Sequence, residues 1–176
     1  MAPARTRTLA RGAADRIGGA DADAVTDAVL TASRLLIAVS ARSIAAVDES
    51  ITLPQFRMLV VLSTHGLMKL SELADQLGVN PSTATRMTDR LVAADLVDRQ
   101  TNPASRREVV LDLTPTGASV VTRVTRRRRQ EIARIIARMP EDHRHGLVHA
   151  LEAFSQAGGE PPVGGGRADA NLAGWI

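Results

Sequence analysis

The chain has 176 residues, enough for one domain of ordinary size that buries most of its apolar side chains. It contains no Cys, which excludes disulfides, thiolate metal sites and a cysteine redox switch. The net charge of +3 conceals an uneven distribution, because residues 80–140 carry twelve Arg against six acidic residues, as expected for a surface that binds a polyanion.

The N-terminal segment, residues 1–23, combines several Arg with the pair Gly18-Gly19 and has no regular apolar period. We therefore expect a flexible basic arm. No apolar run in the chain approaches the roughly 18 to 20 residues of a membrane span. The N-terminus also lacks the apolar stretch of a signal peptide, so we expect a cytoplasmic protein without membrane contact.

Two helices are predicted after this arm. Apolar residues from Val25 to Val39 recur at steps of three and four, which predicts an amphipathic helix over residues 24–48. Leu53-Pro54 places a proline in the first turn of a second helix, which we expect to end near Gly66 and to be followed by a short loop with Met68.

A helix-turn-helix is predicted next. Leu70–Leu77 has the apolar spacing of a short helix, and Gly78 can adopt the left-handed conformation that ends it. Asn80 and Pro81 then form a strong helix start, with Asn80 as the cap. The open side of this second helix, which runs to about residue 94, is expected to contact DNA through Ser82, Thr83, Thr85, Arg86 and Arg90. The alternative is an ordinary amphipathic helix with a solvated polar face.

A basic β-hairpin follows the second helix at once. Leu96-Val97 and Val109–Leu113 have the composition of strands, and a turn-forming loop joins them. Arg106 and Arg107 lie near the tip, where side chains reach a minor groove or its flanking phosphates. A solvated turn would have the same composition, but a helix-turn-helix followed by a basic wing is much more specific than either part alone.

Two further helices are predicted over residues 115–139 and 141–157, and the Gly- and Pro-rich tail 158–176 is expected to be disordered. In the run Arg126–Arg129, successive residues point about 100° apart, so we expect a solvated surface that supplies general positive potential. Arg128 falls on the apolar stripe and is expected to snorkel or to pair with an acid across a dimer seam. His145, His149 and Glu152 share one helix face, but solvated side chains explain them better than a metal site.

Residues 70–117 resemble the winged helix of the MarR regulators, and the similar order of helices extends the resemblance over about residues 24–157. The matching runs are Leu70–Ala74, Pro81–Arg86, Asp89-Arg90-Leu91, Arg106-Arg107 and Leu113–Gly117. The resemblance implies a mainly α fold with a small β-hairpin wing, in which a winged helix-turn-helix over about residues 52–114 lies between dimerisation helices at both ends. It also implies an obligate homodimer that binds a pseudo-palindromic operator on double-stranded DNA.

The resemblance further implies a small-molecule effector, phenolic or otherwise aromatic, in a crevice between the dimerisation helices and the winged helix. Arg42, Phe56, His65 and Met68 are candidates for that crevice, and an ordinary core or surface position is the alternative for each. Members of the family usually carry Asp at the wing positions filled here by Asn102 and Ser105. Because such an Asp would hold a neighbouring Arg, its absence predicts a looser wing.

The predicted function is therefore a sequence-specific DNA-binding transcriptional regulator, a repressor that an effector releases. No nucleophile elbow, phosphate-cradling loop or dinucleotide motif is present, so neither an enzyme nor a cofactor is expected. The alternative is a winged helix that binds proteins without reading DNA sequence. Half-sites are expected roughly 34 to 36 Å apart, about one helical turn of DNA.

Overall fold

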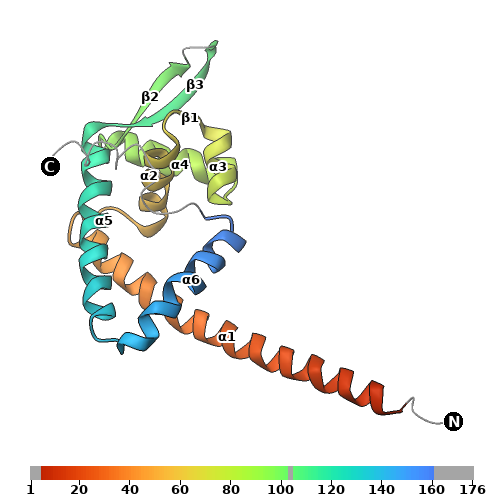
Figure 1. Ribbon diagram of the computed structural model, residues 1–176. Coiled ribbons are helices and arrows are strands. Elements are labelled where there is room, and N and C mark those ends of the chain that lie inside the picture. The colour runs from red at the N-terminus through yellow and green to blue at the C-terminus, as the bar shows by residue number, and fades with distance from the viewer. Residues whose placement is uncertain (1–4, 103–104, 161–176) are drawn as a thin grey trace. The chain divides into compact units, whose positions relative to one another are not determined.

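The computed structural model describes the backbone of residues 5–102 and 105–160, and the side chains of residues 21–102 and 109–160. Its elements in chain order are α1 (Arg5–Ala45), α2 (Leu53–His65), β1 (Met68–Lys69), α3 (Leu70–Leu77), α4 (Pro81–Ala93), β2 (Val97–Asn102), β3 (Ser105–Leu113), α5 (Pro115–Ile136) and α6 (Glu141–Ala157) (Figure 1). This mainly helical architecture with one small antiparallel sheet confirms the predicted fold class. Residues 1–39 and 40–176 form two compact units, which we describe separately.

Helix α1 is longer than its apolar spacing indicates. It begins at Arg5, so the interpretation of residues 1–23 as a flexible arm differs from the helix observed over Arg5–Asp23. Several Ala in this stretch explain the difference, because Ala has the highest helix propensity even where no apolar stripe is present. The division of the chain into arm, domain and tail stays a prediction.

The part of α1 from Asp21 to Ala45 is long and apolar enough to cross a membrane by length and composition alone. The expectation that no segment approaches that length was therefore wrong by this criterion. The reason is that small apolar residues such as Ala raise the mean hydropathy of the segment, although they do not form an unbroken run of large apolar residues. One such helix is weak evidence of a membrane span, because signal sequences and the core helices of soluble proteins have the same length and composition.

Helix α2 begins with a reciprocal cap. The Thr52 side chain accepts a hydrogen bond from the Gln55 amide, while the Gln55 side chain accepts one from the Thr52 amide at 2.9 Å. Such a capping box satisfies two backbone donors that a helix start leaves free. The helix buries Phe56, Met58 and Leu62 among its core residues.

The sheet has the order β1–β3–β2, with β3 in the centre and all pairs antiparallel. The pairing of β2 with β3 confirms the predicted hairpin. The two residues of β1, Met68 and Lys69, pair with Leu111 and Val110, whereas the sequence predicted a loop here. A two-residue strand is too short to show the alternating pattern by which strands are recognised in a sequence.

The core of the second unit is aliphatic and lies where α2, α3, α4, α5 and the sheet meet. Its fully buried side chains include Met58, Leu59, Leu62, Leu73, Leu91, Val97, Leu111 and Val124. Helix α5 joins this core through its N-terminal half only, since Val120, Val121 and Val124 are its buried apolar residues. These helices and the sheet are therefore built around one continuous cluster.

Helix α6 contributes no buried residue among those described, although its apolar spacing predicts an inward face with Leu147, Ala150, Leu151 and Phe154. Its start is tied to α5 by Arg144, whose guanidinium donates hydrogen bonds to the carbonyl oxygens of Met139 at 2.7 Å and Ala137 at 3.3 Å. Capping carbonyls at a helix end with a cation is favourable, because those oxygens carry the negative end of the helix dipole.

Arg128 lies half-buried on the apolar side of α5, as predicted from its place between Val124 and Ile132. Burial lowers the pKa of its guanidinium from the ordinary value. Its Nε is buried without a hydrogen-bond partner among the residues that the structure describes. Pairing with an acid of a second protomer stays a prediction.

Candidate nucleic-acid interface

The turn between α3 and α4 is fixed by three residues within a four-residue segment. Gly78 has φ 65° and ψ 34°, the left-handed conformation predicted for it, and its amide donates to the Ala74 and Asp75 carbonyl oxygens. Asn80 then caps α4, because its side-chain oxygen accepts a hydrogen bond from the Thr83 amide at 2.9 Å. Pro81 occupies the first helical position, where no amide hydrogen is required. The predicted helix-turn-helix is confirmed at the level of its individual caps.

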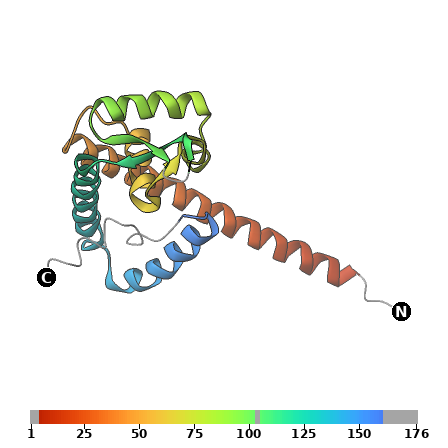
Figure 2. The same cartoon turned by 90° about the horizontal axis from the view of Figure 1, so that it is seen from above.

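One face of α4 is anchored in the core. Ala84, Thr88 and Leu91 are buried there, at 0%, 0% and 1% exposure. Thr88 was not predicted to face inward, because a residue with a hydroxyl group counts as polar when the inner face of a helix is identified from the spacing of its apolar residues. Its hydroxyl donates to the Met58 sulfur at 3.7 Å, which gives the buried polar group a weak partner. With this face fixed, the opposite side of α4 is held outward (Figure 2).

The predicted DNA-reading residues lie along that outward side. Ser82, Arg86 and Arg90 are exposed, while Thr83 and Thr85 are half-buried. The Ser82 hydroxyl donates to the Asn80 side-chain oxygen at 2.9 Å, and the Thr85 hydroxyl donates to the Pro81 carbonyl at 2.8 Å. Because both hydroxyl hydrogens are used within the helix, the oxygens present lone pairs that suit the amino groups of adenine or cytosine.

Arg86 is held only loosely in the free protein. Its Nη2 donates to the Thr83 hydroxyl oxygen at 3.4 Å, a long contact between exposed side chains. A contact of this length is weak. The guanidinium can therefore leave Thr83 for a guanine or a phosphate at little cost.

The wing extends beyond α4 as the hairpin of β2 and β3, with backbone pairing up to Asn102 and Ser105 near its tip. A register irregularity separates Thr101 from Asn102. The predicted DNA contacts Arg106 and Arg107 lie on β3, and their side chains are outside the described residues. The looser wing expected from Asn102 and Ser105 stays a prediction.

An ion pair that the sequence analysis missed links the wing to α4. The Arg99 guanidinium on β2 donates to the Asp89 carboxylate on the exposed side of α4. Both side chains are substantially exposed, at 42% and 52%, so the pair contributes little to stability in water. Its effect is local: Arg99 neutralises the acidic side chain that lies between Arg86 and Arg90 on the exposed side of the helix.

The four predicted effector residues do not come together. Phe56 and Met68 are buried in the aliphatic core, whereas His65 is exposed at the end of α2. Arg42 is exposed and forms an ion pair with Glu131 of α5. In the chain outside the masked segments, no group of three or more His, Asp or Glu is arranged to hold a metal ion.

Two short helices joined by a tight glycine turn, with the second helix capped and turned outward and a β-hairpin directly after it, define a winged helix-turn-helix, a class of DNA-binding domain. Comparison with known proteins agrees. The sequence pattern of the MarR family matches residues 51–109. The HTH-type transcriptional repressor MdtR of Bacillus subtilis is 32% identical over 109 residues, which cover 62% of this chain and 70% of that protein.

Solved structures show the same fold. RV1404 from Mycobacterium tuberculosis superposes with a TM-score of 0.76 at 59% identity, over 81% of this chain and 97% of that one. A mutant MarR from E. coli, crystallised with operator DNA, has a TM-score of 0.57 at 24% identity, over 72% of this chain and 89% of that one, a likeness of fold. The chain belongs to the MarR family of DNA-binding transcriptional regulators, and family membership makes it a regulator rather than an enzyme.

Proposed function

We propose that this protein is a cytoplasmic, homodimeric repressor that binds a pseudo-palindromic operator and is released from it by a small-molecule effector. The outward edge of α4 carries the proposal, because it combines a capped start, small hydroxyl residues and an Arg that is nearly free. The repressor function is supported by its relative MdtR, which is named a transcriptional repressor.

Each part of the interface has a distinct role in this proposal. The N-terminal end of α4 enters the major groove, where Ser82, Thr83 and Thr85 allow close approach and Arg86 reads a base edge. Arg90 lies one turn further along and binds phosphate, which positions the helix without reading sequence. Arg106 and Arg107 of the wing contact the flanking minor groove or its phosphates.

Exposed apolar side chains support self-association. Val148, Leu151 and Phe154 recur every three residues along α6 and are more than half exposed. Helix α1 also exposes large apolar residues, among them Leu30 and Ile37. Large apolar side chains exposed in this way are unfavourable in water and are typical of an interaction site. A second copy of the chain is the partner we propose for it.

The effector part of the proposal rests on the resemblance. A phenolic or other aromatic ligand would bind in a crevice beside the winged helix and alter the spacing of the two α4 helices in the dimer. Of the candidate residues, Arg42 and His65 offer exposed polar groups, while Phe56 and Met68 would act through the core.

The experiment that tests the proposal selects bound fragments from the source genome and measures the recovered sequence by fluorescence polarisation. We expect a preferred pseudo-palindromic sequence and a steep loss of affinity with salt. Arg86→Ala is expected to weaken the preferred site by about 5- to 150-fold, one bidentate base contact, and to relax the preference at one position. Arg138→Ala, an exposed Arg outside α4, is the control.

Two outcomes would contradict the proposal. Binding with no preferred sequence and no salt dependence would favour a winged helix that binds proteins instead of DNA. An unchanged preference in Arg86→Ala would remove this residue from base reading and leave Ser82 and Thr85 as the candidates.

A further inference from the structure

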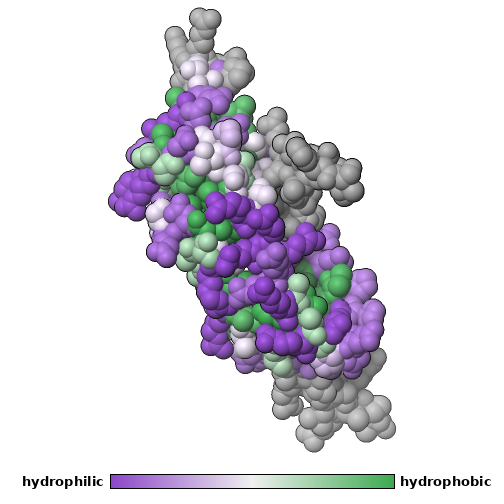
Figure 3. Space-filling model, turned by 90° about the vertical axis from the view of Figure 1, so that its left-hand side faces the viewer, coloured by the Kyte–Doolittle hydropathy of each residue, from purple (hydrophilic) through white to green (hydrophobic). Residues whose placement is uncertain are grey.

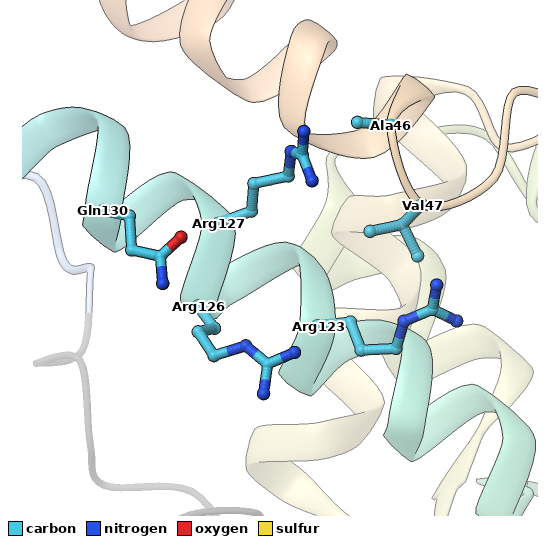
Figure 4. Close-up of a pocket in the computed structure, with 6 residues that line it drawn as sticks. All are labelled: Ala46, Val47, Arg123, Arg126, Arg127 and Gln130. Carbon is cyan, nitrogen blue, oxygen red and sulfur yellow. The ribbon is translucent and has the colours of Figure 1, made fainter.

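Helix α5 carries a stripe of basic side chains that the run Arg126–Arg129 alone does not reveal. Arg123, Arg126, Arg127 and Arg134 are spaced so that they share one helix face, with Gln130 among them. Four successive Arg cannot share a face, because successive helical residues point about 100° apart, but Arg126 and Arg127 share a face with Arg123 and Arg134. Figure 4 shows Arg123, Arg126, Arg127 and Gln130 of this stripe together with Ala46 and Val47.

The stripe lines a hollow at the surface of the second unit. The hollow has a volume of about 450 Å³ and is bounded by Arg123, Arg126, Arg127 and Gln130, with Ala46 and Val47 opposite. An adjoining hollow of about 290 Å³ shares three of these residues and adds Arg42, Glu131 and Arg134. Binding sites for small molecules have volumes of roughly 300 to 1,000 Å³. Figure 3 shows this side of the molecule, where purple hydrophilic residues alternate with green hydrophobic patches.

Three of the guanidinium groups in the larger hollow have no counter-ion. Arg123, Arg126 and Arg127 form no hydrogen bond or ion pair within the described ranges, and the nearby Glu131 is already paired with Arg42. Like charges three and four residues apart on a helix repel one another, so the spacing of these Arg is unfavourable in itself. An anion that lies among the three groups would remove that repulsion.

We propose that this hollow is a binding site for a small ligand with two or more negative charges, carried on phosphate or carboxylate groups. Guanidinium groups present two parallel N–H donors that match the oxygens of both groups. Gln130 adds a neutral donor and acceptor, while Ala46 and Val47 leave space for a ligand at the opposite wall. The apolar part of the lining is small, so an uncharged phenol has little to bind here.

This site is separate from the DNA-reading edge. It lies along the middle of α5, whereas the proposed base contacts lie on α4, and Figure 2 shows these two helices at different sides of the second unit. Helix α5 follows β3 of the wing after the single residue Thr114. A ligand in the hollow therefore contacts the helix that supports the wing without covering the DNA-facing side.

Isothermal titration calorimetry of the full chain with tripolyphosphate, and separately with citrate, tests the proposal without DNA. At about 150 mM salt, where exposed charges more than about 8 Å apart are screened, we expect saturable binding of one of these anions per chain. The double variant Arg126→Gln with Arg127→Gln should weaken it at least tenfold, a rough value for two lost charge-assisted contacts.

Arg129→Gln is the matched control, because it removes the same kind of charge from the same helix outside the hollow. It should leave binding unchanged within about twofold. Equal losses in both variants, or no saturable binding of either probe, would overturn the proposal. A further outcome would overturn the proposal: the wild-type chain binds no anion, and the double variant has a different mass in solution. The stripe would then be an interface between copies of the chain. Circular dichroism of each variant checks that α5 is intact.

Discussion

Gly117 lies where α5 starts against the sheet, and its lack of a side chain is required there. A Cβ built at this position would lie 2.0 Å from the Leu96 carbonyl oxygen and 3.2 Å from a methyl group of Leu113. The same Leu96 oxygen accepts the hydrogen bond of the Thr114 amide at 3.3 Å. Gly117→Ala therefore forces two backbone segments apart, because neither a carbonyl nor a helix start can rotate away as a side chain would.

The expected cost follows from that geometry. Overpacking a core with one extra methyl costs about 1 to 3 kcal/mol, and a backbone contact lies at the upper end. Ala recovers up to about 1 kcal/mol through its helix propensity. The net loss in the free energy of unfolding is thus about 2 kcal/mol or more, which lowers the Tm of a chain of this size by about 4 to 8 °C. Thermal unfolding at fixed protein concentration measures it, since dimerisation would make the Tm depend on concentration.

Gly146→Ala is the control for this prediction. Gly146 lies inside α6, and a Cβ there meets nothing within 4 Å. The same substitution should therefore raise stability by about 0.5 to 1 kcal/mol, through helix propensity alone. If Gly117→Ala raised the Tm as Gly146→Ala does, the close approach of Leu96 to α5 would be refuted.

Three further predictions concern α4 and the core. Asn80→Ala removes the cap of α4 and should cost about 1 kcal/mol in thermal unfolding, with Asn80→Asp near wild type; equal losses would contradict the capping role. A double-mutant cycle of Asp89→Asn and Arg99→Gln should give a coupling energy below about 1 kcal/mol in the free protein, because both groups are exposed. A larger coupling energy would contradict the assignment of this ion pair as a weak surface contact. Leu62→Ala, at 1% exposure, should cost about 2 to 5 kcal/mol in urea unfolding, while Leu67→Ala, at 42%, should cost under about 0.5 kcal/mol; similar costs would contradict the assigned core.

The start of α4 could be predicted from the sequence because its determinants are local. Gly78, Asn80 and Pro81 act on backbone groups within four residues of themselves, so their identity is enough to place the turn and the helix start. The exposed side of α4 follows from the same start through the helical period. The burial of Thr88 could not be predicted in this way, because its buried partner, Met58, is thirty residues away in the chain.

Features that depend on distant pairs could not be predicted. The contact between Arg99 and Asp89 requires the register of β2 against β3 and the angle of the hairpin to α4, and neither is encoded by spacing. The apolar residues of α6 raise a different problem. An amphipathic period shows which side of a helix is apolar, but it does not show what covers that side, so Leu151 and Phe154 were placed inward although this chain leaves them exposed.

The two residues of β1 have a consequence for the order of folding during synthesis. Met68 and Lys69 precede their partners Leu111 and Val110 by more than forty positions, so the ribosome releases the first strand well before the second exists. Until β3 has been synthesised, the backbone groups of β1 that pair with it have no partner strand, and the helix-turn-helix can form only its local contacts. Because β1 and β2 both pair with β3, the sheet can form only after β3 has been synthesised. The wing strand β3 is therefore the element that completes the domain.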